Sequence, residues 1–453
     1  MSFPRYPKYK PSGVEWLGEV PEGWEVKRLR FVANLNPSKS EIADLDKGTF
    51  VSFLPMEAVG NDGMLALDKE KTIAELETGY TYFRDGDVTI AKITPCYENG
   101  KGALMRSLKN GVGFGTTELI VARPIDSQIT SPYLHYIFIS PDFRHIGESH
   151  MYGAGGQKRV PDAFVRNFAT AIPPLPEQTA IANFLDHETA KIDALIAEQQ
   201  RLIELLKEKR QAVISHAVTK GLNPDAPMKA SGIEWLGDVP KHWEVGKCGF
   251  YLTILSGFSF PSAGFSRDEY DIKLLRGINV GVSRLKWDET VYWRRSPGDG
   301  LDVYEIKEGD LVIGMDRPLI GEGMRVAKVK DYDLPCLLLQ RVASLKIRKR
   351  LNSSYLFELI SSEMFIAHFS PDTTGVSVPH ISPEQICNFV IPLPPIAEQQ
   401  AIVAFLDTKL AKFDTLTAEA QRAIDLLQER RTALISAAVT GQIDVRGFQP
   451  VAA

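Results

Sequence analysis

Two loops in the sequence carry side chains that suit contact with the edges of nucleic-acid bases. The first spans 92–101 and the second spans 315–325, and each follows a Gly-Asp turn and a short apolar run. Arginine and lysine can hydrogen-bond to guanine in the major groove, and asparagine can hydrogen-bond to adenine. The candidate contact residues in these loops are Lys92, Thr94, Tyr97, Asn99, Lys101, Arg317 and Arg325.

Two further segments, 155–160 and 373–381, lie at matching positions later in each half and suit contact with phosphate. Glycine amides and a nearby cation position a protein on a phosphate backbone. The candidates here are Gln157, Lys158, Arg159, Thr374, Ser377 and His380. Each charged residue alone is better explained as a solvated surface side chain, but four loops in matching positions favour contact. The basic run 346–350 is either a phosphate patch or a solvated strand end.

No motif in the sequence indicates a catalytic centre. A GxxxxGK[ST] loop is missing, and the glycine-rich Gly153–Gly156 follows no expected strand. The eight histidines form no ligand pair, and the four cysteines have no CxxC spacing, so we expect reduced thiols. Acids flanking the turns at 85–87 and 308–310 are expected to form those turns. We therefore predict a chain without catalytic residues, a metal site or a cofactor of its own.

Size and charge limit what kind of protein this is. With 453 residues, the chain is long enough for two or three domains with their own cores. The net charge of −5 means that any phosphate-binding surface is local or is shared with a partner. The N-terminus has no apolar run, and no stretch is long enough to span a membrane. We expect a cytoplasmic protein.

The elements that must position these loops occur twice. The segment 12–26 is largely identical to 231–245, and 177–219 aligns without a gap on 398–440, whereas the stretches between them barely match. A repeat period this long indicates a duplicated domain and not a solenoid. Two unlike recognition segments between like connectors suit an asymmetric target with two parts.

The repeats 177–219 and 398–440 have the heptad pattern of long helices that pair. Prolines precede each helix, and Gly221 and Gly441 follow, as is typical of helix ends. We expect the two copies to pack on each other as an antiparallel coiled coil, with part of the stripe left for a partner protein. The alternative is that each helix packs only on its own globular domain. The predicted packing residues are Ile181, Leu185, Ile192, Leu195, Leu202, Leu206, Val213, Ile402, Leu406, Phe413, Leu416, Leu427 and Leu434.

The variable parts, roughly 27–172 and 246–391, have the pattern of mixed α/β domains of one fold. Each has a strand after a Gly-Asp turn, a second strand near 118–122 or 342–347, and then a short helix. The tryptophans of the shared segments are expected to pack in the core. The predicted fold is thus α/β (α+β), with two similar globular domains, each followed by a long helix, and pseudo-two-fold symmetry. The predicted divisions are 1–176, 177–221, 222–397, 398–441 and a tail at 442–453.

Taken together, three motifs resemble those of type I restriction–modification specificity subunits. They are WLGxVPxxW near the start of each half, the proline-rich approach to a helix that begins with Glu-Gln, and GGQxxV before it. The resemblance covers essentially the whole chain. One departure is that IPLPPIAEQ, before the second helix, has two more residues than IPPLPEQ before the first, which could shift one domain against its helix.

The resemblance implies two target-recognition domains, a helix pair as spacer, and double-stranded DNA with two unlike half-sites as the target. It also implies two methyltransferase (modification) subunits and restriction (motor/nuclease) subunits as partners. S-adenosylmethionine, ATP and Mg²⁺ would then be bound by those partners. Two other hypotheses stay open from the residues alone: a scaffold with two protein-binding domains, and an unrecognised nuclease or single-chain enzyme.

Overall fold

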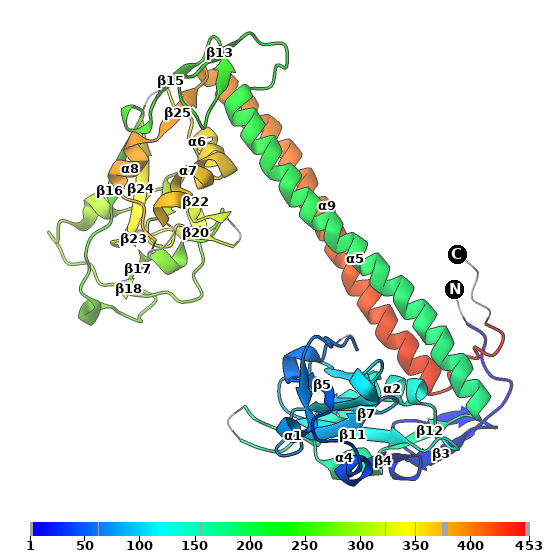
Figure 1. The fold of residues 1–453 in the computed structure, drawn as a ribbon. Coiled ribbons are helices and arrows are strands. Elements are labelled where there is room, and N and C mark those ends of the chain that lie inside the picture. The colour runs from blue at the N-terminus through cyan, green and yellow to red at the C-terminus, as the bar shows by residue number, and fades with distance from the viewer. Residues whose placement is uncertain are drawn as a thin grey trace. The chain divides into compact units, whose positions relative to one another are not determined.

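The structure is a computed structural model that describes residues 3–448 except 62, 155, 322, 349 and 374–378. The chain forms two compact units (Figure 1). Unit 1 comprises Met1–Gln200 and Arg422–Ala453, and unit 2 comprises Arg201–Gln421. Two long helices, α5 (Leu175–Lys220) and α9 (Ile396–Val439), each contribute one part to unit 1 and the other part to unit 2.

Unit 1 contains a mixed α/β domain. Its helices are α1 (Ile73–Leu76), α2 (Ser131–Ile139), α3 (Pro141–Ser149) and α4 (Asp162–Asn167). Its strands are β1 (Tyr9–Pro11), β2 (Glu19–Pro21), β3 (Glu25–Arg28), β4 (Ala33–Leu35), β5 (Phe50–Leu54), β6 (Glu70–Thr72), β7 (Thr81–Arg84), β8 (Val88–Ala91), β9 (Gly102–Leu104), β10 (Val112–Gly115), β11 (Leu119–Pro124) and β12 (Ala169–Ile172). One four-stranded sheet has the order β4-β11-β8-β9 and is antiparallel, and a second four-stranded sheet has the order β6-β5-β10-β7 with β5 and β10 parallel.

Unit 2 contains a second domain on the same plan. Its helices are α6 (Ser353–Ile360), α7 (Glu363–Thr373) and α8 (Pro383–Asn388). Its strands are β13 (Met228–Ala230), β14 (Asp238–Pro240), β15 (Glu244–Lys247), β16 (Leu252–Ser256), β17 (Ile272–Leu275), β18 (Tyr292–Trp293), β19 (Leu311–Gly314), β20 (Leu319–Ile320), β21 (Gly323–Met324), β22 (Val326–Lys328), β23 (Cys336–Leu338), β24 (Val342–Ile347) and β25 (Val390–Leu393). The antiparallel sheet β16-β24-β19-β22 matches the first sheet of unit 1, and the parallel pair β17 and β23 matches β5 and β10. The predicted α/β class and the shared plan of the two variable parts are confirmed.

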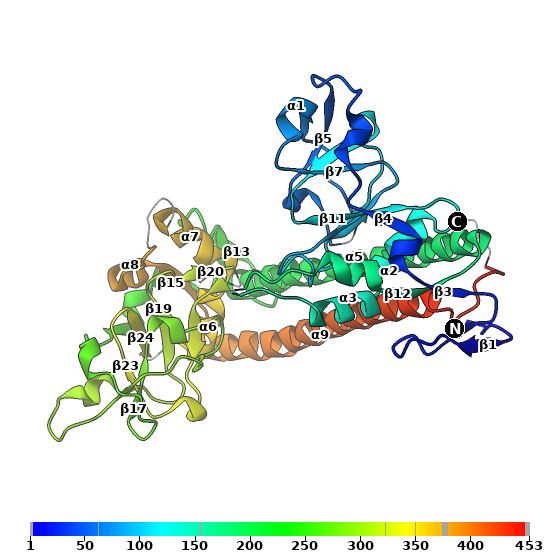
Figure 2. The same ribbon diagram turned by 90° about the horizontal axis from the view of Figure 1, so that it is seen from below.

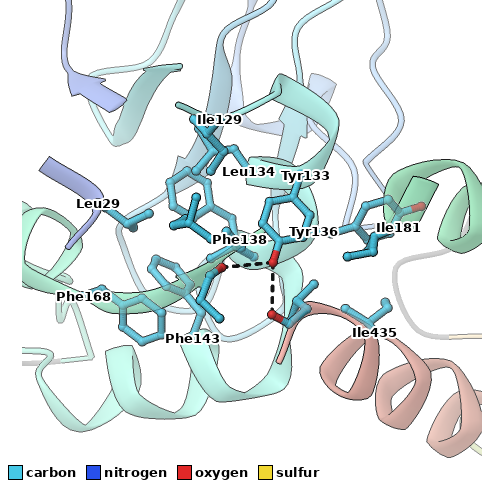
Figure 3. Close-up of a cluster of buried hydrophobic side chains, with 14 of the residues drawn as sticks. Leu29, Ile129, Tyr133, Leu134, Tyr136, Phe138, Phe143, Phe168, Ile181 and Ile435 are labelled. Atoms are coloured by element: carbon cyan, nitrogen blue, oxygen red, sulfur yellow. Dashed lines mark hydrogen bonds between the residues drawn. The ribbon is translucent and has the colours of Figure 1, made fainter. Parts of the chain in front are cut away.

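A buried tyrosine in each unit fastens the globular domain to the end of a long helix. In unit 1, the hydroxyl of Tyr133 lies within hydrogen-bond distance of the carbonyls of Ala171 (3.0 Å) and Val439 (3.1 Å) (Figure 3). In unit 2, the hydroxyl of Tyr355 has the same relation to the carbonyls of Pro392 and Val218. Val439 is the last residue of α9, and Val218 lies in the last turn of α5. The same contact therefore occurs in both units, with the two helices exchanged.

The glutamine of the shared Glu-Gln motif makes a second equivalent contact at the start of each long helix. Gln178 accepts a hydrogen bond from the backbone amide of Thr130, which precedes α2, and donates to two backbone carbonyls. Gln399 makes the same three bonds, with the amide of Asn352 before α6 as donor. Both glutamines are fully buried, so these bonds satisfy polar groups that would otherwise be costly to bury. This explains why the motif occurs twice.

Within each unit the two long helices run antiparallel, as predicted. In unit 1, Asp193 of α5 pairs with Arg431 of α9 (3.0 Å), and in unit 2, Arg210 pairs with Asp414 (2.5 Å). Figure 2 shows α3 beside α9, where Ser436 donates a hydrogen bond to Asp142 (2.7 Å). The early part of one helix thus lies against the late part of the other in both units.

Ten of the thirteen predicted packing residues are buried or lie against the core clusters, and three are exposed. Those that are buried or that pack against the core clusters are Ile181, Leu185, Ile192, Leu206, Val213, Ile402, Leu406, Phe413, Leu427 and Leu434. Leu195, Leu202 and Leu416 are instead 45%, 41% and 45% exposed, so the structure does not bury them between the helices, and their packing against a partner protein stays a prediction. On α5, Ile196 and Ile203, each one residue after an exposed leucine, are partly buried. Positions 195 and 196 are neighbours and point in different directions around the helix. Which of them is buried depends on the side on which the second helix lies.

The two approaches to the long helices have equal length, because two prolines separate β12 from α5 and β25 from α9. The two extra residues inferred from the sequence are therefore not an insertion.

Trp24 and Trp243 are 1% exposed, which confirms their packing role. All four cysteines are free thiols. Among the residues that the structure describes, no helix has the length and apolar composition needed to cross a membrane.

Candidate nucleic-acid interface

In each unit, backbone hydrogen bonds join three segments that include parts of the predicted contact loops. We call this the loop junction; it comprises 92–94, 118 and 158–160 in unit 1, and 315–317, 341 and 379–381 in unit 2. In unit 1, Lys92 donates its amide to the carbonyl of residue 118 and accepts at its own carbonyl from the amide of residue 160. Met315 makes the same two bonds with residues 341 and 381. The amides of Thr94 and Arg317 donate to the carbonyls of residues 158 and 379.

The backbone bonds therefore align the two junctions residue by residue. Ile93 and Arg159 form an isolated antiparallel bridge in unit 1, as Asp316 and His380 do in unit 2. The same bonds bring together the first and second predicted segments within each half. The alignment identifies which residue of one loop corresponds to which residue of the other.

The side chains at these equivalent positions differ in charge. In unit 1, Glu118 accepts a bidentate pair of hydrogen bonds from Arg159, with the shortest N–O distance at 2.7 Å. In unit 2, the position of Glu118 is taken by Arg341. These hydrogen bonds from Arg159 hold the pKa of the Glu118 carboxyl below its usual value. The equivalent backbone position thus carries the acidic Glu118 in unit 1 and the basic Arg341 in unit 2.

Asp316 is the acid of the second junction. It accepts hydrogen bonds from Arg341 and, at 2.7 Å, from His380. Burial would raise the pKa of Asp316, but the two hydrogen bonds and the charges of Arg341 and His380 outweigh it and lower that pKa. Asp316 therefore stays ionised and holds the two cationic or polar side chains in place at the surface.

The loop of unit 1 places its predicted residues unequally. Thr94 is partly exposed, and its hydroxyl lies near Glu98 (3.2 Å) and the carbonyl of Lys158 (3.3 Å). Asn99, Gln157 and Lys158 are exposed, and Lys92 is partly exposed. Lys101 donates to the carbonyl of Met56 (2.9 Å), and this bond holds the loop against the residues that follow β5.

Tyr97 corrects the prediction for this loop. It is fully buried, and its hydroxyl donates to the carbonyl of Phe143 (3.0 Å), so it is a core residue and not a surface contact. Burial raises the pKa of this hydroxyl above its usual value.

In unit 2, Arg325 supports the loop from inside. Its guanidinium donates to the carbonyls of Val280 (2.8 Å) and Asp316 (3.0 Å), and it also reaches that of Arg317 (3.4 Å). Arg317 and His380 are exposed. Thr374 and Ser377 lie outside the described residues.

A surface hollow of about 680 Å³ adjoins the second junction and contains residues that sequence reasoning missed. Arg341, Gln340 and Lys286 line it together with Arg317 and Arg325. Arg341 directly precedes β24, as Glu118 directly precedes β11. The strands were predicted, so the polar residue before each of them was an available signal.

The other charged features have structural roles. Asp87 forms a buried ion pair with Arg123 (2.7 Å) and accepts from the amide of Arg84, and Asp310 accepts from the amide of Lys307, so both acids hold their turns as predicted. In the basic run, Lys346 pairs with Asp310, Arg350 pairs with Glu244, and residue 349 lies outside the described residues. The pairing of its two ends favours a strand end over a phosphate patch.

Comparisons with known proteins agree with this architecture. The family model described as type I restriction modification DNA specificity domain matches residues 21–205 and 297–425. The chain is 32% identical over 464 residues to the Type I restriction enzyme EcoAI specificity subunit of Escherichia coli, which covers 86% of this chain and 78% of that protein. It is 29% identical over 317 residues to the Type I restriction enzyme MjaVIII specificity subunit of Methanocaldococcus jannaschii, covering 69% and 71%.

Two solved structures share the fold at 19% sequence identity, and each comparison covers 93% of this chain and 98% of the other. One, from a study of complex assembly and conformational transition of the type I R-M system, gives a TM-score of 0.73. The other, the HsdS subunit from Thermoanaerobacter tengcongensis, gives 0.56.

Two equivalent α/β units, each with its own polar loop junction and each fastened to a shared helix pair, define a protein built for recognition in two parts. The chain belongs to the family of type I restriction–modification DNA specificity subunits.

Proposed function

We propose that each unit binds one half of an asymmetric, bipartite site in double-stranded DNA, and that α5 and α9 set the gap between the halves. The observation that carries this proposal is the pair of loop junctions, which share their backbone hydrogen bonds but carry different side chains. Glu118 and Arg159 occupy the positions that Arg341 and His380 occupy in unit 2. Base edges present different donors and acceptors, so such a difference suits two unlike half-sites.

The chain acts in this proposal without catalysing a reaction. Two methyltransferase subunits methylate adenine with S-adenosylmethionine, and restriction subunits use ATP and Mg²⁺ to move along and cleave DNA. The acidic net charge of −5 fits a subunit whose partners supply part of the phosphate contact.

Exposed leucines on the long helices support docking of the two methyltransferase subunits. Leu195 of α5 and Leu416 of α9 are equivalent in the repeat, and each is 45% exposed. Leu205 and Leu426 are a second equivalent pair, at 44% and 58%. Because the pairs repeat, they offer the same apolar surface twice, which fits two copies of one partner.

A binding selection tests the proposal. The chain, purified with its methyltransferase subunit, is incubated with duplexes of random sequence, and the bound DNA is sequenced. We expect enrichment of two unlike short sequences at a fixed separation. Enrichment of one ungapped sequence, or of none at a salt concentration that still permits nonspecific binding, would contradict the proposal.

A further inference from the structure

Two arginines of the second loop junction, Arg317 and Arg341, have a left-handed backbone, and they differ in what their side chains contact. Arg317 has a left-handed backbone, with φ at 43°. An L-residue with a long side chain rarely adopts this conformation, and glycine would adopt it without steric cost. Strain of this kind is informative when it is observed at a candidate functional site. Arg341, with φ at 69°, has the same kind of backbone and uses its side chain to pair with Asp316, so the side chain of Arg317 is also expected to have a use.

The backbone of Arg317 is held from two sides. Its amide donates to the carbonyl of Pro379 (2.7 Å), and its carbonyl lies 3.4 Å from the guanidinium of Arg325. Proline follows it at position 318, which restricts its conformation further. The position from which the Arg317 side chain leaves the loop is therefore well defined.

Among the residues that the structure describes, the guanidinium of Arg317 has no partner, in contrast with the other arginines that line the same hollow. Arg325 donates to backbone carbonyls, and Arg341 pairs with Asp316. Within the described part of the chain, no hydrogen bond or ion pair involves the Arg317 side chain, which is exposed. All of its donors are free for a ligand, and two neighbours with fixed roles keep its surroundings in place.

The equivalent residue of unit 1 is Thr94, because both amides donate to the carbonyl at the same place in the junction. The Thr94 hydroxyl already lies near Glu98 and the carbonyl of Lys158. One position on a common backbone thus presents a long, free cation in one unit and a short, engaged hydroxyl in the other.

We propose that Arg317 determines specificity by donating two hydrogen bonds to the O6 and N7 atoms of a guanine in the half-site bound by unit 2. This inference rests on the proposed function. A planar guanidinium with free donors fits that edge of guanine bidentately. The half-site bound by unit 2 accordingly contains one G·C pair whose guanine is recognised by Arg317. The other available use of the side chain, a phosphate contact, would add affinity without discriminating between bases.

The test uses the complex of the full chain with its methyltransferase subunit and the substitution Arg317→Gly. Glycine suits the left-handed backbone, so loss of folding does not explain a loss of specificity. Binding is measured to the selected site and to duplexes in which each position is changed in turn. We expect the variant to lose about 5- to 150-fold of its discrimination at one G·C pair of one half-site, with the other half-site and the gap unchanged.

Arg267→Ala is the matched control, because it removes an exposed cation of unit 2 that is not among the residues lining the hollow. It should leave discrimination unchanged at every position. Equal weakening of all duplexes by Arg317→Gly would indicate a phosphate contact and would overturn the proposal, as would unchanged discrimination. Failure of the unsubstituted complex to select any two-part site would instead refute the proposed function itself.

Discussion

The length of the helix pair should set the gap between the half-sites. The perturbation is a four-residue insertion in each long helix. A second copy of 197–200 is placed after Gln200, and a second copy of 418–421 is placed after Gln421. The two sites are equivalent in the repeat and lie within α5 and α9. Both helices are lengthened because each unit contacts both of them, through bonds such as those of Tyr133 and Tyr355.

The magnitude follows from helix geometry. Four residues lengthen a helix by about 6 Å and turn it about 40° beyond a full turn. DNA rises about 3.4 Å per base pair, and ~10 base pairs per turn correspond to about 35° each. The insertion therefore corresponds to one base pair in rotation and to no more than about two in length.

The assay is methylation-motif mapping by single-molecule sequencing of DNA from cells that carry each variant with the methyltransferase subunit. We expect both half-site sequences to be kept and the gap to grow by one or two base pairs. As a control, the same four residues are inserted after Asp225, in the loop that follows α5, where they leave the helix length unchanged. An unchanged gap in the helix variant, or altered half-site sequences, would refute the reasoning.

Three further predictions concern packing and charge. Leu195→Glu combined with Leu416→Glu should abolish co-purification with the methyltransferase subunit while shifting the chain's own Tm by less than about 2 °C, since both leucines are exposed. Tyr133→Phe should lower the free energy of unfolding by about 1–3 kcal/mol, measured by urea denaturation, because the buried donor that lies between the carbonyls of Ala171 and Val439 is lost. Burial raises the pKa of Glu358 to about 7, so its neutral form stabilises the fold below about pH 4.5, and this contribution is lost as the pH rises to 7. The unfolding free energy of Glu358→Gln should therefore fall less between pH 5 and 7 than that of the unsubstituted chain.

Each of these predictions has a control in the chain. Ala194→Glu with Thr415→Glu places the same charges one residue earlier on each helix and should preserve co-purification. Tyr152→Phe removes a hydroxyl from an exposed ring and should leave stability unchanged. Glu363→Gln, on the exposed side of α7, should retain the pH dependence of the unsubstituted chain. A control that behaves like its test variant would contradict the corresponding argument.

The repeats and the heptad pattern sufficed to predict the two α/β domains and the antiparallel helices. The contact side of each helix was predicted less well. Leu195 and Ile196 are both apolar neighbours, and a helix with 3.6 residues per turn can present either to a partner. The position of the second helix in space decides, and it leaves Leu195 and Leu416 at the surface.

The candidate site could be predicted only to the level of loops. Polar composition identified both loops as candidates, but it does not distinguish a surface tyrosine from Tyr97, whose hydroxyl is satisfied by a carbonyl in the core. The roles of Arg325 and Arg341 depend on backbone carbonyls and on Asp316, which come from distant segments of the chain. Such pairings become visible only when the strands are assembled. The free guanidinium of Arg317 could be recognised only after its neighbours had been accounted for.

The central claim is that one chain reads two unlike half-sites at a fixed distance. The most direct measurement is sequencing of methylated adenine across the genome of cells that express this chain with its methyltransferase subunit, compared with cells that lack only this chain. We predict a new methylation motif with two different half-sites and a gap of constant length. A palindromic or ungapped motif, or the same methylation without the chain, would contradict the account.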